Sequence, residues 1–306
     1  MSPSIKHTSF VFLVLGAFVI AVVFDAKLGF SQSRGGARSG STVKATSAVR
    51  EKPATVGENS STLRIAANRN AELRKELSWT FGGKQQRGWY LYEPLVSQLL
   101  KTTHNTSSEG FAAALVSWQK RSGLVASGVL DEASLNEMVS QWQASRLKNR
   151  SIPPPEDLIT APVSDFYDPT RAEDLRKVER NTYAAYKRMV ASAIADRSLG
   201  LAEGSRGELA AGEKYLKIVS AFRSREYQEK LRRESPNVGR AGLAVNSPHF
   251  TGRALDLYVG GDPVETKDPN RALQVQTRVY QWLVRNAERF GFRPYYYEPW
   301  HWEYVK

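Results

Sequence analysis

The spacing of apolar residues in the first half of the chain predicts two helices. These residues recur at intervals of three or four positions: Leu95, Leu99, Leu100, Phe111, Leu115 and Trp118. Side chains at this spacing share one face of a helix, so each set predicts an amphipathic helix. Gly123 is placed to end the second helix, because glycine readily adopts the left-handed backbone found there. We therefore expect a small all-α domain over residues 72–145.

The second half of the chain mixes helix-like and strand-like patterns. In order, the patterns predict a helix over 171–197, a strand over 215–222, a helix from 224, a strand over 254–260, a helix over 268–290 and a strand-like segment over 292–305. Asp268 can cap the last helix, Pro269 can occupy its first turn, and Gly291 can end it. Strands separated by helices without strict βαβ repetition indicate an α+β domain over residues 163–306, with a largely antiparallel sheet flanked by helices.

Three other segments lack the pattern of a folded core. An apolar run from Phe10 to Phe24 predicts an export signal within residues 1–30. As a helix it would be about 22 Å long, below the roughly 30 Å of a bilayer core, so a cleaved signal peptide and a retained signal anchor both stay open. Residues 31–71, rich in small and polar types, predict a disordered tether, and the Pro-rich stretch 146–162 predicts a linker.

Composition restricts the chemistry that the chain can perform. The 306 residues include no cysteine and carry a formal net charge of +12. Thiolate nucleophiles, disulfides and Cys-based zinc sites are excluded, so any metal must be held by histidines and carboxylates. The positive charge predicts a polyanionic partner, which admits nucleic acid, an anionic membrane surface or an acidic wall polymer.

Two of the four histidines, His249 and His301, lie in the most unusual segments of the second half. In the strand after His249, alternation places Asp256 on the face opposite Leu255 and Leu257. A carboxylate within a strand needs a partner such as a metal, an arginine or backbone donors. Catalytic zinc sites commonly use three such N and O ligands and leave a fourth position for water. We therefore predict that His249, Asp256 and His301 bind Zn²⁺.

A catalytic zinc site also needs a carboxylate that takes a proton from water. Glu298 and Glu303 both flank His301. On a regular strand Glu303 would share the face of His301 and Glu298 would not. Pro299 interrupts the strand, however, and a turn there can bring Glu298 to the metal. Spacing alone leaves both carboxylates as candidates.

Three motifs in this region resemble those of the VanY-type D-alanyl-D-alanine carboxypeptidases, within the zinc peptidases that also include phage endolysins and hedgehog domains. Ser-x-His-x-x-Gly-x-Ala-x-Asp matches residues 247–256, Glu-x-x-His matches 298–301, and Ser-x-x-Arg-Ser-x-x-x-Gln matches 220–228. The resemblance spans about residues 214–305. It implies zinc at the three ligands predicted above.

The resemblance also implies a role for other residues of these motifs. Glu298 would be the catalytic base, and Arg223 would polarise the scissile carbonyl and stabilise the oxyanion. Ser247 and Gln228 would hold the terminal end of the peptide. Three positions depart from the residues that relatives often carry, which leaves substrate preference open: Pro248, Phe250 and Arg253.

A second resemblance lies upstream, over residues 116–139. The stretch VSWQKRSGLVASGVLDEASLNEMV resembles the peptidoglycan-binding helical repeat that precedes many wall hydrolases. The matching positions are Gln119, Gly123, Leu124, Gly128, Leu130 and Asp131. A generic three-helix domain is the alternative.

We therefore expect an exported, zinc-dependent enzyme of the cell envelope that cleaves peptidoglycan stem peptides, removing a terminal D-alanine. An L,D-carboxypeptidase and a wall endopeptidase are the enzymatic alternatives. A non-catalytic wall-binding protein with structural zinc is the alternative of another class, although it would need no base. A nucleic-acid partner fits the charge but not the motifs, so we expect none. Oligomeric state and contact with membrane or wall polymer stay open.

Overall fold

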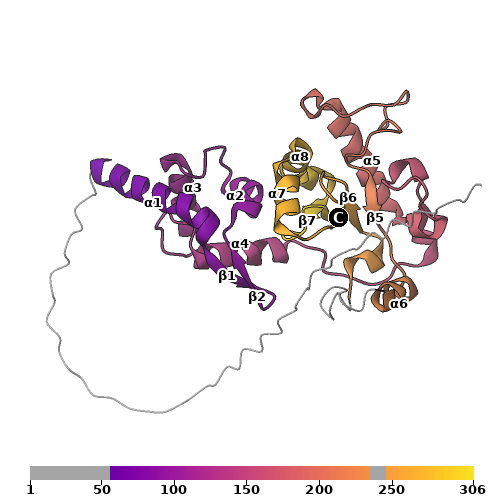
Figure 1. Ribbon diagram of the computed structural model, residues 1–306, viewed down its shortest axis with the longest axis horizontal. Helices are drawn as coiled ribbons and strands as arrows, with labels where there is room; N and C mark the ends of the chain where they lie inside the picture. Colours follow the sequence, from indigo (N-terminus) through magenta and orange to yellow (C-terminus); the bar gives the residue numbers. More distant parts are fainter. Residues whose placement is uncertain (1–55, 235–245) are drawn as a thin grey trace, which may run out of the picture.

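The computed structural model describes residues 56–234 and 246–306, which form two packed blocks (Figure 1). We call residues 56–147 the N-terminal block and residues 158–306 the C-terminal block. The N-terminal block is mostly helical, and the C-terminal block combines antiparallel strands with helices. The predicted α+β class is confirmed.

The N-terminal block contains the predicted helices and also a hairpin. Its elements are α1 Val56–Glu76, β1 Ser78–Phe81, β2 Lys84–Arg87, α2 Glu93–Leu100, α3 Glu109–Arg121 and α4 Glu132–Ala144. Helix α3 ends before Gly123, whose φ of 69° is left-handed as predicted. The antiparallel pair β1–β2 was not predicted, because its strands are short and largely polar. Gly82 and Gly83 supply two successive positive φ angles, which a tight hairpin turn requires.

Helix α1 corrects part of the predicted tether. Residues 31–71 were expected to be disordered, yet α1 begins at Val56 and packs on α3. The contact needs few large apolar residues, since Ala66 and Ala67 are buried and let the backbones approach closely. Asn70 is also buried, where its amide donates to the carbonyl of Gly128 over 2.8 Å. The predicted export signal and the rest of the tether, residues 1–55, lie outside the described residues.

The C-terminal block is built on a four-stranded antiparallel sheet with the order β5-β6-β8-β7. A separate pair, β3–β4, includes residues from the stretch that was predicted to be a linker. Among the described helices, none combines the length and the hydrophobicity needed to cross a bilayer. The elements are β3 Leu158–Thr160, β4 Lys177–Glu179, α5 Arg180–Ala195, β5 Ile218–Ser220, α6 Arg225–Glu234, β6 Ala254–Leu257, α7 Asp268–Gln276, α8 Arg278–Asn286, β7 Phe292–Pro294 and β8 His301–Tyr304.

The helix predicted over residues 268–290 is divided in two by Thr277. The Thr277 hydroxyl accepts a hydrogen bond from the amide of Tyr280 over 3.1 Å, which caps the start of α8. The same hydroxyl lies 2.9 Å from the carbonyl oxygen of Val259, to which it can donate. Asp268 is the first residue of α7 instead of its cap. Gly291, with a φ of 93°, ends the last turn as predicted.

The two blocks share one hydrophobic cluster. Tyr296, between β7 and β8, contacts the rings of Phe81, Tyr92 and Trp142 in the N-terminal block. Helix α2 lies beside α8 (Figure 1). In α7, Arg271 is 1% exposed and donates to the hydroxyl of Tyr92 over 2.9 Å. The aromatic segment before β8 therefore packs the blocks together.

Candidate metal centre

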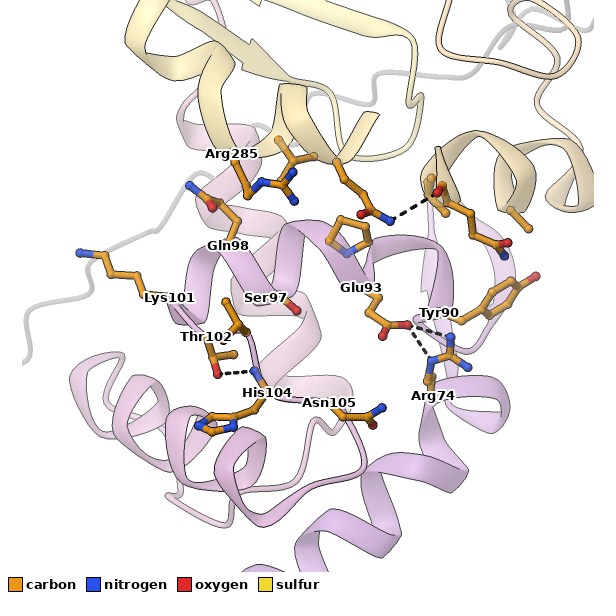
Figure 2. A pocket seen from close by; sticks show the side chains of 17 residues that line it. Arg74, Tyr90, Glu93, Ser97, Gln98, Lys101, Thr102, His104, Asn105 and Arg285 are labelled. Atoms are coloured by element: carbon orange, nitrogen blue, oxygen red, sulfur yellow. Dashed lines mark hydrogen bonds and ion pairs between the residues drawn. The ribbon is translucent and has the colours of Figure 1, made fainter. Parts of the chain in front are cut away.

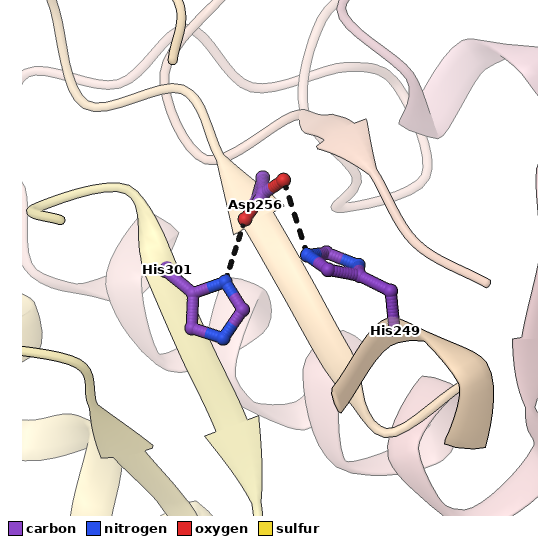
Figure 3. A group of neighbouring side chains, drawn as sticks. All are labelled: His249, Asp256 and His301. Atoms are coloured by element: carbon purple, nitrogen blue, oxygen red, sulfur yellow. Dashed lines mark hydrogen bonds and ion pairs between the residues drawn. The ribbon is translucent and has the colours of Figure 1, made fainter. Parts of the chain in front are cut away.

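Three potential metal ligands converge on one face of the sheet (Figure 3). Asp256 comes from β6 and His301 from β8, and the two residues are register partners on these adjacent strands. His249 comes from the 3₁₀ turn Pro248–Thr251 that precedes β6. All three side chains are buried. The sheet thus holds two of them rigidly, and the turn brings in the third.

The distances between the three side chains fit a metal ion. Nε2 of His249 lies 3.3 Å from Oδ2 of Asp256, and Nδ1 of His301 lies 2.9 Å from Oδ1. One ligand atom from each residue lies within 4.8 Å of the other two. Ligand atoms about 2.1 Å from a tetrahedral ion lie about 3.4 Å from one another. Two imidazoles and one carboxylate at these distances therefore fit a divalent cation such as zinc.

A hydrogen-bond acceptor holds the far nitrogen of each imidazole. Nδ1 of His249 lies 2.7 Å from the carbonyl oxygen of Ala221, to which it can donate. Nε2 of His301 lies 3.3 Å from Oε1 of Glu303. Such contacts orient a ring and select the tautomer that leaves the other nitrogen free for a metal. Nε2 of His249 and Nδ1 of His301 are therefore the nitrogens available for ligation.

Burial and mutual charge set the protonation of the metal-free site. Burial, together with the charge of Arg223, lowers the pKa of His249 to about 4. Burial would also lower the pKa of His301, but hydrogen bonds to Asp256 and Glu303 raise it to about 9. Burial alone would raise the pKa of Asp256, yet the two histidines hold this pKa well below the usual range. A divalent ion would therefore replace a proton that the metal-free site holds on His301.

Glu298 reaches the same site through a turn. The amide of Glu298 donates to the carbonyl of Tyr295 over 3.1 Å, and its carbonyl accepts from the amide of His301 over 2.9 Å. Strand β8 begins only at His301, two residues after Pro299. Glu298 Oε2 consequently lies 4.0 Å from Nδ1 of His301, the nitrogen that faces Asp256. Burial raises the pKa of Glu298 to about 7, which suits proton transfer at neutral pH.

Arg223 also lies at the site. It follows β5 and is buried, with its Nη2 3.2 Å from Oδ2 of Asp256. Its Nε donates to the hydroxyl of Ser220 over 3.2 Å, which fixes the plane of the guanidinium. Arg223 thus places a fixed positive charge beside the candidate ligands.

The two predicted substrate contacts differ in their surroundings. Ser247 caps the turn that carries His249, since its hydroxyl accepts from the His249 amide over 3.3 Å. Gln228, in α6, is 3% exposed, and its Oε1 has no hydrogen-bond partner among the described residues. The contact of Ser247 supports the fold of the site, whereas the buried carbonyl oxygen of Gln228 lacks the partner that such a group usually has among the described residues.

Sequence reasoning considered Glu303 only as an alternative base, and it assigned Arg146 no function. Glu303 is 0% exposed and lies behind the ring of His301, on the side away from Asp256. The two-residue spacing did place it on the face of His301, but could not show which nitrogen it contacts. Arg146 forms a buried ion pair with Glu303 from 157 positions away in the sequence. No sequence pattern indicated that contact, because residue 146 was assigned to a linker.

A groove of about 620 Å³ lies apart from the metal centre, between the two blocks (Figure 2). Its walls come from α2 and the loop after it on one side, and from α7 and α8 on the other. Lys101, His104 and Arg285 contribute polar side chains, and Arg74 pairs with Glu93 over 2.8 Å. The groove is thus lined by both apolar and polar side chains, and its charged residues are mostly basic.

Comparison with known proteins adds one match. Residues 176–306 match the family model VanY, described as D-alanyl-D-alanine carboxypeptidase. The match includes the candidate ligands, Glu298, Arg223, Ser247 and Gln228, but not Arg146. No curated protein matches the chain.

Proposed function

Residues 176–306 form a VanY-type domain, and from this premise we propose that the protein is a zinc-dependent D-alanyl-D-alanine carboxypeptidase. The family itself implies a peptidase that acts on peptidoglycan peptides. The observation that carries the finer proposal is the buried trio His249, Asp256 and His301 with Glu298 beside it. A ligand set with an adjacent carboxylate of raised pKa is typical of hydrolytic zinc sites.

His249, Asp256 and His301 would hold the zinc. Zinc bound there would supply a Lewis acid that polarises a carbonyl and lowers the pKa of water to about 7. The three ligands are rigid, since two come from adjacent strands and each imidazole is held at its far nitrogen. They therefore need little rearrangement to bind.

The remaining residues would handle the proton, the developing charge and the substrate. Glu298 would take a proton from the attacking water and return it to the leaving amine. Arg223 would donate to the carbonyl oxygen as negative charge develops, because a fixed guanidinium stabilises an oxyanion strongly in a buried site. Ser247 and Gln228, whose buried Oε1 has no partner within residues 56–234 and 246–306, would hold the terminal end of the peptide.

We place the enzyme at the cell envelope. The apolar run over residues 10–24 supports export, and the stretch 116–139 supports contact between the N-terminal block and peptidoglycan. Zinc with only a structural role, in a non-catalytic wall-binding protein, would not require a carboxylate placed as Glu298 is. We therefore favour an enzyme.

Mass spectrometry of purified muropeptides tests the proposal. The protein, without residues 1–55, is incubated with pentapeptide and tetrapeptide stems, with and without a zinc chelator. We expect a chelator-sensitive loss of one D-alanine from the pentapeptide only, and no loss with Glu298→Gln. Loss from the tetrapeptide would indicate an L,D-carboxypeptidase, and an internal cut would indicate an endopeptidase. No cleavage by a zinc-loaded protein would contradict an enzymatic function.

A further inference from the structure

Glu303 is surrounded by donors on both carboxylate oxygens. It lies in β8, between β6 and β7, and is 0% exposed. Its Oε1 faces Nε2 of His301 at 3.3 Å. Its Oε2 accepts from the backbone amide of Leu147 over 2.9 Å. A carboxylate so deeply buried needs such partners, because an uncompensated charge there is costly.

The remaining donors to Glu303 come from Arg146, in the N-terminal block. Its Nε donates to Oε1 over 3.1 Å, and its Nη2 forms an ion pair with the same oxygen. The guanidinium is itself positioned, since Nη1 donates to Gln143 of α4 over 2.9 Å and the carbon Cζ lies 4.0 Å from the centre of the Tyr295 ring. Arg146, just after α4, thus holds its guanidinium in a fixed orientation toward Glu303.

We propose that Arg146 and the Leu147 amide are positioning groups of the metal centre, which hold Glu303 against Nε2 of His301 and thereby present Nδ1 to the metal. This inference rests on the proposed zinc site. It extends that site beyond the matched family segment, since residues 146 and 147 precede residue 176. The N-terminal block then has a second role besides any contact with the cell wall, because it completes the support of a ligand.

The chemistry of the contact explains why arginine is needed. Guanidinium presents several donors in one plane, so it can direct both Nε and Nη2 at one carboxylate while Nη1 binds Gln143. Lysine keeps the charge but supplies a single donor atom on a flexible chain. Outer contacts to a metal-binding histidine fix its orientation, and their loss typically lowers metal affinity or activity about 10- to 100-fold.

The test compares Arg146→Lys with Arg271→Lys. Both arginines are buried and both join the two blocks, but Arg271 contacts Tyr92 and Asp268. Zinc affinity is measured on each full-length protein by competition with a chelator, together with thermal unfolding, kcat and KM. We expect Arg146→Lys to weaken zinc binding about 10-fold or more and to lower kcat at subsaturating zinc with little change in KM. Arg271→Lys should lower the melting temperature and leave zinc affinity unchanged.

Glu303→Gln is the second variant, because it keeps the size of the side chain and an oxygen for His301. We expect it to weaken zinc binding as Arg146→Lys does. The double variant should bind zinc no more weakly than the single variant with the lower zinc affinity. Unchanged zinc affinity in folded Arg146→Lys and Glu303→Gln would overturn the inference. Equal losses in Arg146→Lys and Arg271→Lys would also overturn it, since docking of the blocks would then be the cause. A wild-type protein that binds no zinc would instead refute the zinc site itself.

Discussion

At the scale of single residues, the two glutamates around His301 are distinguished by the nitrogen that each one faces. Glu298 lies 4.0 Å from Nδ1, on the side of Asp256, whereas Glu303 lies 3.3 Å from Nε2. Glu298 shares its side of the ring with the candidate ligand Asp256, whereas Glu303 is bound to Arg146 and Leu147. Of the two glutamates, Glu298 is therefore the one that we propose as the base.

Replacement of Glu298 should separate catalysis from metal binding. We expect Glu298→Gln to lower kcat by about 10²- to 10⁴-fold, which is the usual contribution of a general base. Zinc content should stay unchanged, whereas His301→Ala should lose both zinc and turnover. Muropeptide turnover and metal analysis of the purified variants measure both effects. A normal rate in Glu298→Gln, with loss in Glu303→Gln at saturating zinc, would reverse the two assignments.

The raised pKa of Glu298 predicts the direction of the pH dependence. Burial raises the pKa to about 7 in the metal-free site, and a nearby divalent cation favours the carboxylate and lowers it. A base must be ionised, so kcat/KM should rise with pH through this pKa and level off above it, with the acidic limb at or below pH 7. The profile is recorded at saturating zinc. The same limb in the residual activity of Glu298→Gln would show that another group titrates.

At the scale of elements, a single glycine sets the path of the turn that carries His249. Gly252 has a φ of 66° at the end of the turn Pro248–Thr251. A Cβ atom there would lie 2.8 Å from the backbone nitrogen of Glu179, which is the last residue of β4 and the N-cap of α5. The turn and β4 are therefore packed closely enough that a side chain at this position would displace one of them.

The substitution Gly252→Ala should therefore destabilise the protein by more than the cost of placing alanine at a left-handed φ. Gly200 is a matched control, because it has the same φ of 66° with open space around it. We expect both Gly→Ala variants to lose about 1–2 kcal/mol from the left-handed backbone. Gly252→Ala should lose a further amount on the order of 1–3 kcal/mol from the steric clash. Urea denaturation measures the loss of unfolding free energy in both variants. Equal losses would mean that β4 shifts to accommodate the added methyl group without cost.

At the scale of the whole molecule, the two blocks behave structurally as one body with a shared core. The hydrophobic cluster continues from α2–α4 into the sheet, and buried Arg146 and Arg271 cross the boundary. Residues 146 and 147 are buried against β8 instead of spanning a gap. The metal centre therefore depends on contacts between segments far apart in the sequence.

A shared core predicts cooperative unfolding. We expect far-ultraviolet circular dichroism and tryptophan fluorescence to report one coincident urea transition, because neither block can open without exposing apolar surface of the other. Two separate transitions would support independent domains joined by a flexible linker.

Zinc should stabilise this cooperative unit. A ligand present at about 100 times its Kd stabilises the folded state by about 2.7 kcal/mol. We therefore expect addition of a chelator to lower the melting temperature of the wild-type protein and to leave that of His301→Ala unchanged. Scanning calorimetry measures the shift. An equal shift in both proteins would place the stabilising zinc elsewhere.

The sequence alone predicted the features that depend on neighbouring positions. Apolar periodicity predicted α2, α3 and the α+β class, and strand alternation placed Asp256 on the face opposite Leu255 and Leu257. The convergence of His301 with Asp256, 45 positions away, was inferred instead from zinc-ligand chemistry and the family motifs. Pro299 indicated that a turn could bring Glu298 to them. The inferences from periodicity, alternation and Pro299 succeed because backbone geometry relates nearby residues directly.

Only the tertiary structure decided the features that depend on distant segments. Helix α1 was mistaken for a tether because its small buried residues carry little apolar signal, and the break at Thr277 depends on a bond to Val259. Arg146 was assigned to a linker because of the Pro-rich stretch that follows it, and its contact with Glu303, 157 positions away, has no local sequence pattern. Contacts of this kind depend on which surfaces pack together, and the local spacing of residues does not predict that packing.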